Sequence, residues 1–178
     1  MTIDEVDAVY EIWKDRAENG TRIKYRDPET LTQRLKRISE ITVIACNRND
    51  DGRLTSYCEI ICTTPRVDLS SFQVGDHTPL PLFHILISHI IDFGCILSVT
   101  GGVSGSGGYS LPGPDENTAL NGSETQVQPI VESLAESGIA IVPKSELLKA
   151  YGNGRRNPNQ YVDRDPLWFD VLFHFDME

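Results

Sequence analysis

Two β-rich runs separated by a turn decide the fold class: residues 41–62 read ITVIACNRNDDGRLTSYCEIIC. Residues 41–46 and 54–62 are rich in the β-branched and aromatic side chains that favour strands. The turn between them ends in Asp51-Gly52, a pair that suits the positive φ of a hairpin turn. The stretch therefore predicts an antiparallel hairpin, and Pro65 is expected to end its second strand.

Upstream of the hairpin, the sequence predicts two helices. Segment 4–19 carries apolar residues at the i, i+3, i+4 and i+7 spacing of one helical face: Val6, Val9, Tyr10 and Trp13. Thr2 and Glu5 have the spacing of a capping box at its start, and Gly20 is expected to end it. A second, shorter helix is expected directly after Pro28, because proline early in a helix costs no hydrogen bond.

Downstream, the most apolar part of the chain lies between residues 79 and 99. Residues 79–93 are apolar nearly all round, which predicts a central helix covered on most sides, and residues 95–99 predict a buried strand. Asp92 and Gly94 interrupt this window, and an aspartate costs roughly 2.5–3.5 kcal/mol at the centre of a membrane span. We therefore expect two buried elements here and no membrane-spanning segment.

Glycine, serine, proline, aspartate and asparagine dominate residues 101–122, which predicts a flexible surface loop within the domain. A phosphate-binding loop needs a helix directly after its glycines, and Pro112-Gly113-Pro114 stands there instead. After this loop the patterns predict, in order, a helix over 126–137, a strand over 139–142, a helix over 144–151 and a strand over 167–175.

An antiparallel pair followed by alternating helices and strands indicates an α+β (mixed α/β) fold. We expect a single globular domain over residues 1–178, with a mixed sheet that contains the N-terminal hairpin and has helices packed on it. A chain of 178 residues, 39% hydrophobic and 24% charged, can bury such a core without a disulfide or metal staple.

The chain is acidic, with 16 basic and 26 acidic residues and a formal net charge of −10. Nucleic-acid binding needs dense clustered cations, so this balance argues against a nucleic-acid partner. Residues 41–178 hold eight basic and 17 acidic residues, which places the excess after residue 40. The N-terminus is acidic and lacks the apolar run of a secretory signal, so we expect a cytoplasmic protein.

Four cysteines raise the question of a disulfide or a metal site. Cys58 and Cys62 lie four apart on the second expected strand, which separates them by about 13 Å, too far for one zinc ion or one disulfide. We therefore expect buried, reduced thiols, with neither a metal nor a cofactor.

His84 and His89 are expected on one helix, about 140° apart round its axis. Zinc proteases use a spacing of four, which directs both imidazoles to one side, so this pair does not indicate a metal site. A histidine polarised by Ser88 or Asp92 would suit a general base, but no nucleophile motif accompanies it. We therefore favour buried histidines satisfied by neighbours and assign no catalytic residue.

The expected C-terminal strand carries the candidate partner-binding surface. One face is apolar, and the other combines Trp168, Asp170 and His174, a composition that suits protein recognition. The preceding segment adds an aromatic and two carboxylates: Tyr161, Asp163 and Asp165. The alternatives are an ordinary solvated strand face and a metal or catalytic site that a third element would have to complete.

Two classes of function follow. The first is a binding protein whose acidic surface captures a basic protein, because long-range attraction raises the rate of encounter between opposite charges. Such a protein is similar in character to bacterial immunity or antitoxin proteins, which neutralise basic nuclease toxins by covering them. The second is a small-molecule-binding or hydrolytic enzyme domain that uses His84, His89 or His174, with the glycine-rich loop as a lid.

Overall fold

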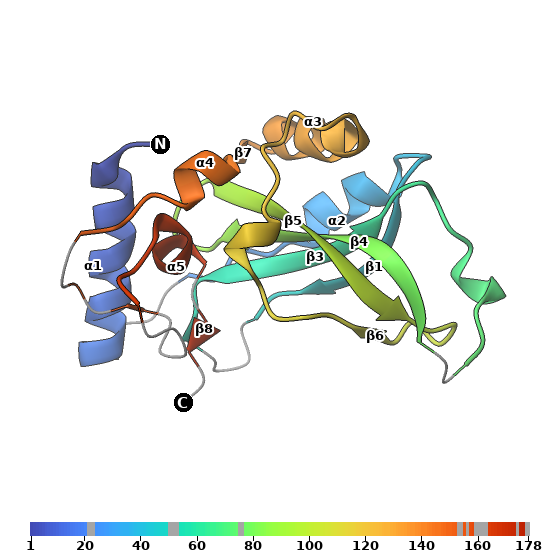
Figure 1. The fold of residues 1–178 in the computed structure, drawn as a ribbon, viewed down its shortest axis with the longest axis horizontal. Helices are drawn as coiled ribbons and strands as arrows, with labels where there is room; N and C mark the ends of the chain where they lie inside the picture. Colours follow the sequence, from blue (N-terminus) through green and yellow to red (C-terminus); the bar gives the residue numbers. More distant parts are fainter. Residues whose placement is uncertain are drawn as a thin grey trace.

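The protein is a single α+β domain in which a six-stranded mixed sheet is packed between helices (Figure 1). Its structure, a computed structural model, describes residues 1–20, 24–49, 54–74, 77–152, 155, 157–158, 164–173 and 175–176. The α+β fold class expected from the sequence is confirmed. Among these residues, no helix is both long enough and apolar enough to cross a membrane.

The predicted hairpin is confirmed as β1 (Thr42–Asn47) paired antiparallel with β3 (Tyr57–Thr63). The expected second strand is, however, divided between two sheets. Its first part, β2 (Leu54–Thr55), leaves the main sheet and pairs with β8 (Phe175–Asp176) near the C-terminus. The Asp51-Gly52 turn lies outside the described residues.

The helix predicted over residues 79–93 is wrong, because most of this segment forms strand β4 (Thr78–Ser88). Strand β4 pairs antiparallel with β3 and with β5 (Phe93–Val103), so it lies at the centre of the sheet. Both faces of β4 are covered, and seven consecutive residues from Leu82 to Ser88 are buried. A strand buried on both faces is a continuous apolar run and looks, in sequence, like an all-round apolar helix.

Two short strands complete the sheet along the free edge of β5. Strand β6 (Tyr109–Ser110) pairs antiparallel with the end of β5, and β7 (Ala140–Ile141) pairs parallel with its beginning. The strand order is β1-β3-β4-β5-β6, with β7 beside β5. The strands predicted over 95–99 and 139–142 are therefore confirmed as parts of β5 and β7.

The helices begin and end close to their sequence signals. Helix α1 (Ile3–Asn19) starts with the Thr2–Glu5 capping box and ends at Gly20, whose φ of 67° suits glycine. Helix α2 (Glu29–Lys36) follows Pro28, and α3 (Gln128–Glu136) lies within the predicted 126–137 segment. Helix α4 (Lys144–Leu147) covers only the first half of its predicted range.

The two faces of the sheet have separate cores, as the period of two along a strand requires. On one face Leu82 and Leu86 of β4 pack with α1, α4 and α5 (Trp168–Leu172), which lie side by side at one end of the molecule (Figure 1). On the other face Ile85 and Ile87 pack beneath α2 and α3. The two helical layers therefore present separate outer surfaces to solvent.

The strand predicted over residues 167–175 is wrong. Residues Trp168–Leu172 form the short helix α5, and the extended residues Phe175–Asp176 form β8. Every side chain from Trp168 to Phe173 is buried. Odd- and even-numbered residues of this segment both face the core. The segment therefore lacks the exposed strand face that the sequence alternation predicted.

The glycine-rich segment 101–122 is only partly a loop. Its first residues continue β5 to Val103, which is fully buried, and Tyr109–Ser110 form β6. A short 3-10 helix follows at Glu116–Thr118, and Ala119 is again buried. Composition alone concealed these contacts, because glycine and serine lack the side chains by which core strands are recognised.

Candidate functional sites

The predicted partner-binding residues do not share one exposed surface in the described chain. Trp168 is 6% and Asp170 is 1% exposed, so both side chains are covered by the protein itself. Asp165 is exposed, in the segment that leads into α5. The remaining three, Tyr161, Asp163 and His174, lie outside the described residues.

The buried carboxylate of Asp170 is an internal anchor. It accepts hydrogen bonds from the guanidinium of Arg164 at 2.5 and 3.3 Å and from the backbone N–H of Leu167 at 2.7 Å. Arg164 also lies 2.7 Å from the carboxylate of Glu116. These bonds satisfy the first turn of α5 and tie it to the segment before α3, which accounts for an aspartate in the core.

An exposed acidic row lies instead on helix α1. At about 100° per residue, four exposed carboxylates fall within an arc of about 60° on its outer side: Asp4, Glu11, Asp15 and Glu18. We call this row the α1 acidic face. Ile12 borders it, with 41% of its surface exposed. No ion pair to Asp4, Glu11 or Glu18 occurs within the described part of the chain.

The α1 acidic face was missed at the sequence level although its signal was present. Residues 1–40 are nearly neutral as a block, with eight basic and nine acidic residues. Of the two basic residues of α1, Arg16 turns inward to donate to the hydroxyl of Tyr25 at 2.9 Å, and Lys14 is exposed beside the row. Counting charge per helical face, rather than per segment, would have located this surface.

His89 lies in the turn between β4 and β5, whereas the sequence predicted it on a helix. Its Nδ1 accepts a hydrogen bond from the backbone N–H of Arg26 at 3.0 Å, and its ring meets the edge of Tyr25. Burial, followed by the nearby charges of Arg26 and Arg16, lowers the pKa of His89 to about 4. The ring is therefore neutral at neutral pH and holds the chain before α2 against the sheet.

His84 forms a polar pair with Glu59 on the same face of the sheet as Leu82 and Leu86. Its Nε2 donates to the Glu59 carboxylate at 2.5 Å, and its side chain is 3% exposed. The other ring nitrogen, Nδ1, is buried and has no hydrogen-bond partner among the described residues. A carboxylate that orients one nitrogen of an imidazole leaves the other available as a base.

Two further polar groups complete this cluster. Asn47 of β1 donates through Nδ2 to Glu59 at 2.7 Å and to the hydroxyl of Tyr109 at 2.6 Å. Because β1 and β6 lie at opposite ends of the strand order, the sheet must curl for Asn47 and Tyr109 to meet. Four strands thus contribute one polar cluster, defined as Asn47, Glu59, His84 and Tyr109. Its local signal was a single carboxylate within an apolar strand, which sequence reasoning passed over.

The cysteines behave as small hydrophobic residues. All four are free thiols, and Cys58, Cys62 and Cys95 are buried. Burial raises the pKa of Cys58 and Cys62 to about 12 and that of Cys95 well above its ordinary value. Within the described chain, no three His, Cys, Asp or Glu side chains are grouped closely enough to hold a metal ion.

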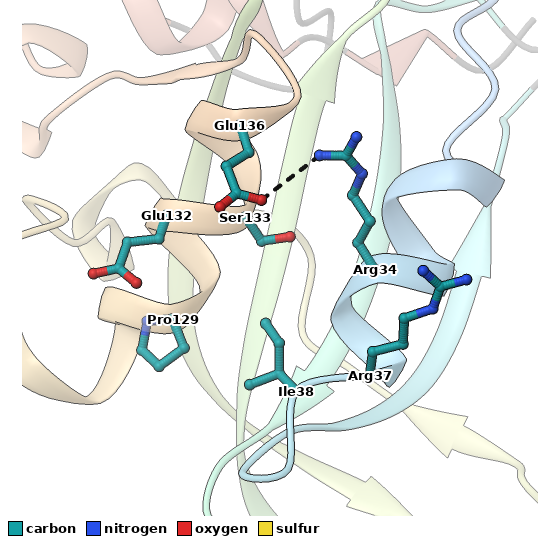
Figure 2. Close-up of a pocket in the computed structure, with 7 residues that line it drawn as sticks. All are labelled: Arg34, Arg37, Ile38, Pro129, Glu132, Ser133 and Glu136. Carbon is teal, nitrogen blue, oxygen red and sulfur yellow. Dashed lines mark ion pairs between the residues drawn. The ribbon is translucent and has the colours of Figure 1, made fainter.

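A groove runs between α2 and α3 on the opposite side of the sheet from α1. It consists of two adjoining pockets of about 560 and 340 Å³, which share Arg34 and Glu136. Figure 2 shows the larger pocket, with the arginines on α2 and the turn after it, and the glutamates on α3. Its lining residues are Arg34, Arg37, Ile38, Pro129, Glu132, Ser133 and Glu136.

Comparison with protein-family models, with curated proteins and with solved structures found no match to this chain.

Proposed function

We propose that this protein acts by binding a basic partner protein, in the manner of an immunity or antitoxin protein that covers a basic toxin. The α1 acidic face is the proposed docking surface, in place of the C-terminal segment expected from the sequence. The observation that carries the proposal is the row of four exposed carboxylates on one side of this helix. Asp165 is exposed as well and adds to the negative charge of the surface.

Charge and apolar surface together support this surface. A net charge of −10 attracts a basic protein over long range, and a local row of carboxylates orients it on arrival. Ile12 beside the row and Ile3 at the start of the helix are 41% and 48% exposed. Apolar side chains next to a charged rim are a common composition for the contact area of a protein interface.

The test is a charge-neutralised variant against the purified product of the adjacent open reading frame, the first partner to examine. Glu11→Gln with Glu18→Gln removes two charges and keeps good helix formers. We expect at least tenfold weaker binding at 50 mM salt, and a smaller salt dependence of the dissociation constant, measured by calorimetry.

The matched control removes the same two charges elsewhere, by Glu29→Gln with Glu40→Gln at exposed positions outside α1. Both double variants lose the same total charge, so both lose the same long-range attraction. The control keeps the local contacts of α1 and is therefore expected to bind within about twofold of the wild type. Equal loss in both double variants would place the effect in the overall charge and contradict the α1 acidic face as the docking surface.

A second candidate function, hydrolysis or small-molecule binding through His84, is favoured by the Glu59–His84 pair with its unpartnered Nδ1. The probe is p-nitrophenyl acetate, whose hydrolysis reports a general base or an acyl-accepting imidazole. A catalytic His84 predicts turnover above buffer that falls at least tenfold in His84→Gln and stays within twofold in His89→Asn. Identical rates in both variants would contradict it.

A further inference from the structure

The α2–α3 groove has opposite charges on its two sides. Arg34 and Arg37 lie on the α2 side, and Glu132 and Glu136 lie on the α3 side (Figure 2). All four residues are exposed. A bound molecule would therefore meet guanidinium groups at one end and carboxylates at the other.

Two of the four charges of the groove form a weak, exposed ion pair with each other, and the other two have no ion-pair partner in the described chain. Arg34 and Glu136 form an ion pair at 3.8 Å, and their side chains are 43% and 75% exposed. An exposed pair at this distance contributes little to stability and can exchange for a ligand. No ion pair to Arg37 or to Glu132 occurs in the ranges that the structure describes.

Between its charged sides the larger pocket is apolar apart from the hydroxyl of Ser133. Ile38 and Pro129 line the larger pocket, and the side chain of Ser133 points toward α2 (Figure 2). The adjoining pocket continues over the apolar side chains of Leu31, Ile87 and Ile139. A volume of about 560 Å³ lies within the range of small-ligand sites, which are mostly apolar with a few placed polar groups.

We propose that the α2–α3 groove binds a short free peptide by its two charged ends. Its carboxylate pairs with Arg37 and its terminal ammonium pairs with Glu132, the two charged side chains that lie outside the Arg34–Glu136 ion pair. Small side chains suit the apolar middle of the groove, which Ile38 and Pro129 line. Arginine on the carboxylate side fits the bidentate geometry that guanidinium and carboxylate groups prefer.

This inference does not depend on the proposed partner-binding function. The groove lies over the core that contains Leu31 and Ile130, whereas α1 packs on the core of the opposite face. A failure of either proposal leaves the other in place.

The experiment uses tri-alanine and two blocked forms, N-acetyl-tri-alanine and tri-alanine amide, titrated into the full chain by calorimetry at low salt. Each blocked form lacks one terminal charge and keeps the aliphatic body. We expect saturable binding of tri-alanine and at least fivefold weaker binding of each blocked form. Equal binding of all three, or no binding of tri-alanine at millimolar concentration, would overturn the proposal.

Two variants test which side of the groove binds which end of the peptide. Arg37→Gln is expected to weaken tri-alanine at least fivefold while leaving the amide unchanged, because the amide has no carboxylate to lose. Glu132→Gln is expected to do the same for tri-alanine and to leave the acetylated form unchanged. Arg66→Gln and Glu40→Gln, exposed and outside the groove, are the matched controls and are expected to bind as the wild type does.

A fourth peptide separates a free peptide from a segment of a protein. Acetyl-Glu-Ala-Ala-Lys-amide carries the same two charges on side chains and has no charged terminus. Weaker binding of this peptide than of tri-alanine supports recognition of free ends. Tighter binding would overturn the proposal and point to a mixed-charge segment of a protein as the occupant.

Discussion

The guanidinium of Arg164 lies 2.5 Å from the carboxylate of Asp170, which is 1% exposed, and 2.7 Å from that of Glu116. One arginine thus joins the C-terminal helix to a turn 48 residues earlier in the chain. Because the Asp170 carboxylate also accepts the Leu167 N–H, it closes the first turn of α5. The aspartate that the sequence pattern assigned to partner binding is therefore part of the folded core.

Replacing Asp170 by asparagine is expected to cost about 2–3 kcal/mol of the free energy of unfolding. Breaking a buried ion pair leaves a charge without a partner, which destabilises the folded state. The loss in free energy of unfolding is moderate here, because Arg164 is a third exposed to solvent and retains its ion pair with Glu116. Urea unfolding measures it. Asp165→Asn, at the neighbouring exposed carboxylate, is the control and is expected within 0.5 kcal/mol of the wild type, as is usual at the surface. Equal stabilities of the two variants would show that the Arg164 pair does not support the fold.

Gly105→Ala is expected to destabilise the protein by about 1–3 kcal/mol, the usual cost of overpacking. A Cβ at this position would lie 2.1 Å from the backbone oxygen of Phe72, and neither of these backbone groups can move freely, since Gly105 donates to Gln73 at 3.2 Å. Thermal unfolding checks this prediction.

Gly113→Ala is the matched control in the same glycine-rich segment. A Cβ at Gly113 would have no heavy atom within 4 Å, so the substitution is expected to leave stability unchanged or raise it slightly through the unfolded state. A neutral Gly105→Ala would mean that the loop does not pack on Phe72, which is the arrangement that a mobile lid would require.

The sequence predicted correctly those helices and strands whose ends are set by nearby residues. The Thr2–Glu5 box and Gly20 placed both ends of α1, and the hairpin followed from two β-rich runs. Strand β4 was mistaken for a helix because its two covered faces remove the alternation that marks a strand. Segment 167–175 failed for the opposite reason, since a chance alternation of polar residues masked a buried helical turn.

The polar clusters escaped prediction because they depend on strand register. Glu59 is paired with Leu86 and His84 with Ile61, so the two polar side chains become diagonal neighbours on one face. No spacing within a single segment encodes that meeting. The same holds for the α2–α3 groove, whose sides come from helices about 100 residues apart in sequence.

Only Cys46 is expected to react with a thiol reagent in the native protein. Burial raises the pKa of all four thiols and suppresses the reactive thiolate, but Cys46 is only half-buried, so a reagent can reach its sulfur, whereas the other three cysteines are buried. Titration with Ellman's reagent at pH 8 should give at most one thiol per native chain and four in guanidinium chloride. Cys46→Ser should abolish the native reaction. Two or more reactive thiols in the native chain would contradict this burial.

The stability of the protein is expected to fall between about pH 6.5 and pH 4 because of His89. Burial lowers the pKa of His89 to about 4 in the folded protein, whereas an unfolded histidine titrates near 6.5. Within this window the unfolded chain binds a proton that the folded chain excludes, so each step down in pH favours unfolding. The loss approaches roughly 2–3 kcal/mol at the acid end and is absent above the unfolded pKa.

His89→Asn isolates this effect, because the asparagine oxygen can take the place of Nδ1 in accepting the Arg26 N–H but carries no titrating group. Urea unfolding at pH 7, 6, 5 and 4.5 should show the variant losing less stability than the wild type as the pH falls. His77→Asn, at an exposed histidine, is the control and should run parallel to the wild type. Because carboxylates titrate equally in all three proteins, only the difference between curves reports His89. A His89→Asn curve parallel to the wild type would mean that the folded protein accommodates a charged ring at this turn.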